Sequence, residues 1–307
     1  MLTGIHETLL PAITVGRFPG HSATRVFTPG VIRAKDLIRP LTAACQSSWA
    51  AGQTAVWSFK PHPGDVTSGA WKPQVEALAG WLRANPGNRT IVVIWHEPEN
   101  DVPKWFRQPE DFVYLFNTVH DWATNVWPEL VTCHAALAYR YGTTKNGIGD
   151  AEAARWRTRA TLNAVDAYSG RTWPVDRILP ELPGFVRWHT CVAQGGPWAV
   201  TERGWAASPD EYGLRAETID REAAWLASNL PEMYLVWATP GAEKDPELLL
   251  DPSGEDAVRR LLTRLNLPAG FEPSPIPGVL VHTGTGLLVA ADRTTAFLTW
   301  ADGRDLP

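Results

Sequence analysis

Short apolar segments rich in β-branched and aromatic residues recur along the chain, and each one ends in polar residues or in Gly and Pro. The segments are apolar almost throughout, which is typical of parallel strands that are covered on both faces. From the third segment onward their starts lie about 32 to 40 residues apart, the length of a strand plus a crossover helix. The predicted strands are 11–18, 24–29, 54–59, 90–97, 130–139, 162–168, 197–202 and 233–238.

The segments between these strands carry helical patterns. Apolar residues recur there every three or four positions, and Pro73 and Pro109 stand where helices can begin. Helices are predicted for 73–84, 109–126, 214–228 and 254–265. The segments 34–50 and 176–192 contain prolines, which predict kinked or broken helices.

The alternation of eight strands with helices predicts a (β/α)8 TIM barrel over residues 1–268, because such a barrel needs about 250 residues. After Pro268 a Pro-rich linker leads into a different pattern. Residues 269–307 resemble two or three short antiparallel strands, so we expect a small β-rich C-terminal extension. This extension would either cap the barrel or belong to a binding module.

Composition narrows the class of protein. Hydrophobic residues make up 44% and charged residues 20%, so the chain can build a large core. A net charge of -5 argues against a nucleic-acid partner, and no apolar run approaches the roughly 20 residues of a membrane span. The three cysteines are scattered, which excludes a disulfide framework.

The first residues of the chain show no basic region followed by an apolar one, so no secretory signal is predicted. We therefore expect either a cytoplasmic protein or one that leaves the cell by another route, such as within a phage virion.

Two acidic residues stand where the active site of a barrel is expected, at the carboxyl ends of the strands. Glu97 ends the fourth predicted strand and Glu202 ends the seventh, and these two strand ends face each other across the barrel mouth. An unpaired carboxylate at the edge of a core is costly to desolvate, so its presence at two strand ends favours a functional site. The alternative is that each glutamate merely pairs with a basic residue, such as the adjacent Arg203.

Two carboxylates that meet over one cleft are what retaining glycoside hydrolysis needs. One protonates the leaving oxygen and later deprotonates water, and the other attacks the anomeric carbon. For this direct attack the two carboxyl groups must stand about 5–5.5 Å apart. The negative charge of one carboxylate also raises the pKa of the other, which keeps it protonated near neutral pH.

The sequences around both glutamates resemble those of a known group. His-Glu-Pro at 96–98 and Thr-Glu-Arg-Gly-Trp at 201–205 look like the paired motifs of retaining glycosidases with catalytic glutamates on strands four and seven. A His residue directly before the first glutamate is typical of glycoside hydrolase family 26, which includes β-mannanases. The resemblance covers roughly 11–266 and implies Glu97 as acid/base, Glu202 as nucleophile, and His96 contacting the sugar's 2-position or orienting the nucleophile.

The sequence departs from that family at two places. Pro-Glu-Asn-Asp follows Glu97 where Met-Asn-Gly is frequent, and its Glu99 is a second candidate for the acid. Arg203 puts a cation next to the predicted nucleophile in the sequence, where it would alter specificity or lower the pKa of Glu202.

Further residues at strand ends are candidates for binding sugar. By the resemblance, Tyr168 would hydrogen-bond the nucleophile and Trp237 would form the floor of the subsite for the reacting sugar. Trp205 would form a wall of the cleft, one of 16 tryptophans whose flat faces can stack on sugars. The candidates for binding sugar hydroxyls are Arg17, Lys60 and His62, each of which is equally an ordinary surface residue.

Motifs for other chemistry are missing from the sequence. It contains no G-x-S-x-G, no phosphate-binding loop, no G-x-G-x-x-G and no H-E-x-x-H, so no cofactor and no metal are predicted. His134 lies within the fifth predicted strand and is expected to be a core residue.

The leading hypothesis is a retaining, endo-acting glycoside hydrolase that cleaves a β-linked polysaccharide or oligosaccharide. The alternative is a non-catalytic carbohydrate-binding barrel within a larger assembly, such as a phage tail or a cell-surface complex. In that case the C-terminal extension would contact the assembly partner.

Overall fold

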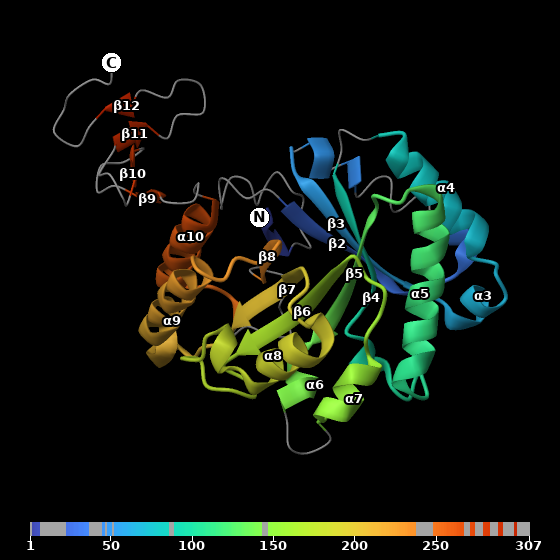
Figure 1. Cartoon of the computed structure of the whole chain (residues 1–307). Coiled ribbons are helices and arrows are strands. Elements are labelled where there is room, and N and C mark those ends of the chain that lie inside the picture. Colours follow the sequence, from blue (N-terminus) through green and yellow to red (C-terminus); the bar gives the residue numbers. More distant parts are fainter. Residues whose placement is uncertain are drawn as a thin grey trace.

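Eight parallel strands form a closed barrel in chain order (Figure 1). The computed structural model describes residues 2–6, 23–36, 45–46, 48–50, 52–85, 89–142, 147–237, 248–266, 271–273, 279–282, 288–290 and 298–299. The barrel strands are β1 (Leu2–His6), β2 (Ala23–Ile32), β3 (Thr54–Pro61), β4 (Thr90–His96), β5 (Val131–Leu137), β6 (Leu162–Ser169), β7 (Trp198–Trp205) and β8 (Met233–Trp237). Because β8 pairs with both β7 and β1, the sheet closes on itself, and the predicted (β/α)8 barrel is confirmed.

The position predicted for the first strand is wrong. Strand β1 is Leu2–His6, which pairs with β2 on one side and β8 on the other. It is five residues long and includes Thr, Gly and His, so no apolar run marks it in the sequence. The predicted segment 11–18 lies outside the described residues, while the other seven predicted strands overlap β2 to β8.

Helices cover the outside of the barrel where the sequence places them (Figure 1). They are α3 (Pro63–Thr67), α4 (Lys72–Arg83), α5 (Pro109–Val126), α6 (Ala138–Gly142), α7 (Asp150–Arg155), α8 (Pro183–Trp188), α9 (Tyr212–Leu226) and α10 (Pro252–Asn266). The four predicted helices correspond to α4, α5, α9 and α10 within two residues at each end. Among the helices of the described residues, none is both long and apolar enough to cross a membrane.

The two Pro-containing segments are broken, as predicted. In 176–192 a 3-10 turn (Leu179–Glu181), α8 and a π turn (His189–Ala193) follow one another. In 34–50 a 3-10 turn covers Ala34–Asp36, and the middle of the segment lies outside the described residues.

Inside the barrel, strand residues at alternate positions change from apolar to polar toward the carboxyl ends of the strands. Strand β6 shows the pattern: Leu162 and Ala164 belong to the buried apolar core of the barrel, and Asp166 and Tyr168 follow two and four residues further on. Because successive side chains of a strand point to opposite faces, these four share the inner face. The half of the barrel interior near the amino ends of the strands is therefore an apolar core, and the half near their carboxyl ends carries polar groups.

A second core lies between the barrel and its helices. It holds most of the large buried side chains, and His134 belongs among them, as the sequence predicts. This histidine is fully buried between the rings of Phe112 and Phe116, and burial lowers its pKa to about 3.

Within the described residues of the C-terminal extension there are four short strands, where two or three were expected. They are β9 (Phe271–Pro273), β10 (Val279–His282), β11 (Leu288–Ala290) and β12 (Leu298–Thr299), and they form an antiparallel sheet in the order β12-β11-β10-β9. This sheet, which is drawn in red in Figure 1, follows α10 in the chain. A domain boundary at residue 268 stays a prediction.

Candidate active site

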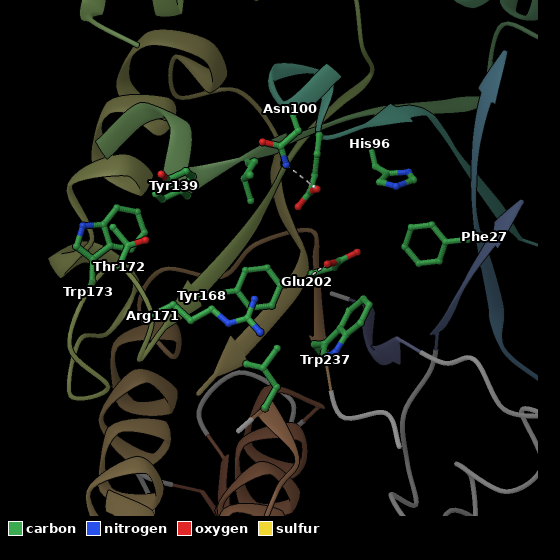
Figure 2. Close-up of a pocket in the computed structure, with 13 residues that line it drawn as sticks. Phe27, His96, Asn100, Tyr139, Tyr168, Arg171, Thr172, Trp173, Glu202 and Trp237 are labelled. Atoms are coloured by element: carbon green, nitrogen blue, oxygen red, sulfur yellow. Dashed lines mark hydrogen bonds between the residues drawn. The ribbon is translucent and has the colours of Figure 1, made fainter. Parts of the chain in front are cut away.

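A cavity of about 670 Å³ opens at the carboxyl ends of the barrel strands. Both predicted catalytic glutamates lie in its wall, together with aromatic side chains from several strands (Figure 2). The lining residues are Phe27, His96, Glu97, Asn100, Leu137, Tyr139, Tyr168, Arg171, Thr172, Trp173, Glu202, Trp237 and Leu248.

An irregular backbone at the end of β4 aims Glu97 into the cavity. Val93 pairs with Cys133 of β5 but His96 pairs with Ala135, so β4 contains one extra residue and forms a bulge. On either side of His96 the backbone is left-handed, with φ 61° at Trp95 and φ 49° at Glu97. Each such conformation costs on the order of 1–3 kcal/mol for a residue with a side chain, and such strain clusters at functional sites.

Contacts outside the cavity hold this strained turn. The Trp95 indole N–H donates to Asp101 Oδ2 at 2.8 Å, and Lys60 Nζ lies 2.7 Å from the same oxygen. The Trp95 ring also packs edge-on against Phe106, with centroids 4.6 Å apart. Within the turn, the Asn100 amide donates to Glu97 Oε2 at 3.2 Å.

A second bulge precedes Glu202 in β7. Val165 of β6 pairs with Val200, but Asp166 pairs with Glu202, so Thr201 is an extra residue. The hydroxyl of Thr201 donates to Asp166, and Glu202 lies against the buried Arg25, so both side chains point into the barrel although they are neighbours in sequence. The bulge thus gives β7 two successive inward side chains.

Two donors fix the carboxylate of Glu202. Arg25 Nη1 lies 2.9 Å from Oε1, and the hydroxyl of Tyr168 donates to Oε2. Both Arg25 and Glu202 are buried. The hydrogen bond from Tyr168 is the contact that the family resemblance leads us to expect.

Three carboxyl groups converge in the site. One oxygen from each of Glu97, Asp166 and Glu202 lies within 4.8 Å of the other two. Burial and the negative charge of Asp166 raise the pKa of Glu97 to about 7, while Lys60 and Arg25 oppose the rise. Burial also raises the pKa of Asp166 and of Glu202. The negative charge of Asp166 adds to the rise at Glu202, and Arg25 opposes the rise at both.

Of the predicted sugar-binding residues, His96, Tyr168 and Trp237 line the cavity. The His96 ring stands edge-on to Phe27 at 4.8 Å, and the Trp237 ring lies 6.5 Å from that of Tyr168. These aromatic groups come from β2, β4, β6 and β8, and they lie on several sides of Glu202 (Figure 2).

Two of the predicted hydroxyl-binding residues, Lys60 and His62, are not brought to the cavity. Lys60 is paired with Asp101, and His62 lies beside Trp105, with ring centroids 5.6 Å apart. Neither Lys60 nor His62 is among the lining residues. Arg17 lies outside the described residues.

The expected roles of Trp205 and Arg203 are wrong. After the bulge, Glu202 and Gly204 face the barrel interior, so Arg203 and Trp205 face the helices. Arg203 forms a buried ion pair with Glu222 of α9 at 2.8 Å, and its guanidinium stacks on Trp205 at 4.5 Å. Trp205 is fully buried and Arg203 faces away from the Glu202 carboxylate, so the cation beside the candidate nucleophile is Arg25.

This correction can be tested with Trp205→Ala. Removing a fully buried tryptophan is expected to lower the free energy of unfolding by about 3–5 kcal/mol, because it leaves a cavity between the barrel and its helices. Urea unfolding curves of the parent and the variant measure the effect. A variant with unchanged stability but a raised KM would indicate instead that Trp205 contacts the substrate in the cleft.

Glu99 is separated from the cavity by its contacts. Its carboxylate accepts hydrogen bonds from the Tyr141 hydroxyl at 2.6 Å and the Leu137 backbone N–H at 3.2 Å, and it is 1% exposed. Burial raises the pKa of Glu99 to about 8. This geometry favours Glu97, the half-buried carboxyl in the cavity wall, as the acid.

The sequence analysis did not identify Arg25 and Asp166 as site residues. Both are buried inside the barrel, and Arg25 contacts Glu202. The signal was present in each case, because both are charged residues inside apolar strand segments, at 24–29 and 162–168. A buried charge needs a partner, so two opposite charges within predicted strands indicate a buried ion pair. That pair is observed at 3.0 Å.

Gly204 provides the space in which Tyr168 reaches Glu202. A Cβ atom at Gly204 would lie 2.7 Å from Cδ1 of Tyr168 and 3.1 Å from Leu248. Gly204→Ala is therefore expected to displace the Tyr168 ring and to lower kcat by about 10–100-fold, because the carboxylate of Glu202 loses a positioning donor. Gly213→Ala in α9, where a Cβ meets nothing within 4 Å, is the matched control and should keep the parent kcat in the same assay.

Comparison with known proteins identifies the fold. No family model and no curated protein matches the sequence. Similar solved structures include GH5_18 from Streptomyces cattleya in complex with GlcNAc, with 16% identity, a TM-score of 0.61, and coverage of 90% of this chain and 82% of that one. A GH39 β-xylosidase from Caulobacter crescentus has 13% identity and a TM-score of 0.59 over 97% of this chain and 76% of that one.

An exo-β-1,4-mannosidase from Opitutaceae bacterium strain TAV5 has 12% identity and a TM-score of 0.60, over 86% of this chain and 60% of that one. At these identities the likeness shows that the chain shares the TIM-barrel fold of these structures. Two of these structures belong to glycoside hydrolase families 5 and 39, so the resemblance to family 26 stays a prediction.

Proposed function

We propose that the chain is a retaining glycoside hydrolase that acts on a β-linked polysaccharide or oligosaccharide. The observation that carries the proposal is the pair Glu97 and Glu202, which lie at the carboxyl ends of β4 and β7 and have oxygens within 4.8 Å of each other in one cavity. Retaining enzymes have carboxyl groups about 5–5.5 Å apart, whereas inverting enzymes need about 6.5–9.5 Å to admit a water molecule. The short separation supports direct attack on the sugar.

In the first step, Glu202 attacks the anomeric carbon while Glu97 gives its proton to the leaving oxygen. The bond from the anomeric carbon to that oxygen breaks, and an ester bond to Glu202 forms. In the second step, Glu97 takes a proton from water, the water oxygen bonds to the anomeric carbon, and the ester bond breaks. Glu202 returns as a carboxylate and Glu97 is protonated again, so the cycle balances.

The surrounding residues support these roles. Arg25 and the Tyr168 hydroxyl each bind one oxygen of Glu202, so they hold the nucleophile in one orientation. Glu97 accepts a hydrogen bond from the neutral Asn100 amide, and its raised pKa suits an acid that works near neutral pH. Trp237 offers an aromatic face to the sugar.

The alternative of a non-catalytic carbohydrate-binding barrel would be favoured by carboxyl groups that lie far apart, or by a salt bridge that holds one of them away from the cavity. Both glutamates line the same cavity, and the ion pair of Glu202 with Arg25 leaves it there. The geometry therefore favours the hydrolase.

The proposal is tested by incubating the protein with a set of plant and bacterial cell-wall polysaccharides and measuring released reducing ends. We expect release from at least one polysaccharide by the parent and none by Glu202→Ala. Equal release by both proteins would refute the assignment of Glu202, and no release from any β-linked polysaccharide or oligosaccharide would favour a binding protein.

A further inference from the structure

A third carboxyl group, Asp166 of β6, lies below the two glutamates and has no role in the steps above. Its Oδ1 accepts hydrogen bonds from the Thr201 hydroxyl at 2.6 Å and from Arg25 Nη1 at 3.0 Å. The side chain is fully buried, and its Oδ2 has no hydrogen-bond partner among the described residues. One oxygen of Asp166 lies within 4.8 Å of an oxygen of each glutamate.

The charges around this group do not balance. The same Nη1 of Arg25 contacts both Asp166 and Glu202, so one guanidinium is shared by two of the three carboxyl groups. Lys60 is held 2.7 Å from Asp101. The charged and titratable groups that act on this cluster are Arg25 of β2, Lys60 of β3, Glu99 beside Glu97, Cys133 of β5, Tyr168 of β6 and Glu202 of β7. Carboxylates within about 4–6 Å disfavour each other's ionisation, so one of the three keeps a proton near neutral pH.

Hydrogen bonding decides which carboxyl keeps the proton. Asp166 and Glu202 each accept a hydrogen bond from Arg25 and one from a hydroxyl, and a charged donor strongly favours the ionised form. Glu97 accepts only the neutral amide of Asn100 among its described side-chain contacts. The proton therefore belongs on Glu97.

We propose that Asp166 is a positioning residue whose negative charge keeps the proton on Glu97 in the free enzyme. This inference rests on the proposed function, because it gives Asp166 a task toward the acid Glu97. Unlike the charge of Glu202, which disappears when the sugar ester forms, the charge of Asp166 is present throughout the cycle. The charge of Asp166 is also the second cause, after burial, of the raised pKa of Glu97.

The test follows the ionisation of Glu97 without any substrate. The protein is labelled with ¹³C at the carboxyl carbons of glutamate, and the Glu97 signal is assigned by its loss in Glu97→Gln. We expect a midpoint near pH 7 in the parent and a midpoint about one pH unit lower in Asp166→Asn. An unchanged midpoint in a folded Asp166→Asn variant would overturn the proposal.

Glu222→Gln is the matched control. Glu222 is also fully buried and paired with an arginine, Arg203 at 2.8 Å, but it lies outside the barrel wall. Damage to a buried ion pair is common to both variants, so only loss of the charge near Glu97 distinguishes them. The Glu97 midpoint should stay at the parent value in Glu222→Gln, and an equal shift in both variants would mean that the effect is merely structural.

Thr201→Val serves if Asp166→Asn does not fold. This substitution keeps the side-chain volume but removes a donor to Asp166, which weakens the ionisation of Asp166. The Glu97 midpoint should then move down by less than in Asp166→Asn, and an unchanged or higher midpoint counts against the proposal. Because the titration needs no substrate, a protein that cleaves no glycan can still show the shift, so the two proposals fail separately.

Discussion

Glu202→Ala is expected to lower kcat/KM by about 10⁵-fold or more, the loss that follows removal of a covalent nucleophile in other enzymes. The substitution removes the atom that attacks the anomeric carbon but leaves Glu97 and the aromatic lining in place. Arg25 keeps its ion pair with Asp166, so the buried cation is not left without a partner. Initial rates on the glycan found by the polysaccharide screen measure the loss, with thermal unfolding as the check on folding.

Azide provides a control for this variant, because it is a small anion that can enter the space left by the carboxylate of Glu202. Attack from that face gives a glycosyl azide whose anomeric configuration is opposite to that of the substrate. A variant that recovers activity by forming this product supports the assigned role. Parent-like hydrolysis by Glu202→Ala without azide would eliminate it.

Glu97→Ala is expected to show a loss that depends on the leaving group. General acid catalysis contributes about 10²–10⁴-fold, so cleavage of a natural glycosidic bond should fall by that factor. An aryl glycoside with an acidic phenol needs no proton on its leaving oxygen, so its first step should be almost unaffected. The ratio of the two rates in the parent and the variant is the measurement.

Glu99→Ala is the comparison for Glu97→Ala, since both residues follow β4 and only Glu97 lines the cavity. The Glu99 variant should lose stability, because the Tyr141 hydroxyl and the Leu137 N–H lose their acceptor. It should not discriminate between leaving groups. If Glu99→Ala discriminates and Glu97→Ala does not, the acid has been assigned to the wrong residue.

The sequence predicted the barrel well because the apolar segments and helical patterns repeat with a regular period. The positions of Glu97 and Glu202 were predictable because this pattern locates the strand ends, and each glutamate stands where an apolar strand meets polar residues. Strand β1 was misplaced because five residues containing Thr, Gly and His carry no apolar pattern. Its place in the sheet depends on pairing with β2 and β8, which are distant in sequence.

The bulges explain the error at Trp205. Alternation along a strand assigns faces only while the register is regular, and one extra residue reverses every assignment beyond it. The bulge at Thr201 brings Glu202 inward and turns Trp205 outward, and no pattern in the sequence marks this change. Arg25 and Asp166 did carry a signal, a charge inside an apolar strand, but their contact joins β2 to β6 across the barrel.

The most direct test of the central claim is the anomeric configuration of the first product, followed by ¹H NMR from the moment the protein is mixed with its glycan. Attack by Glu202 followed by attack of water inverts the anomeric carbon twice, so the first sugar released should have the same configuration as the bond that was cleaved. A first product with the opposite configuration would show a single displacement by water and would contradict the account.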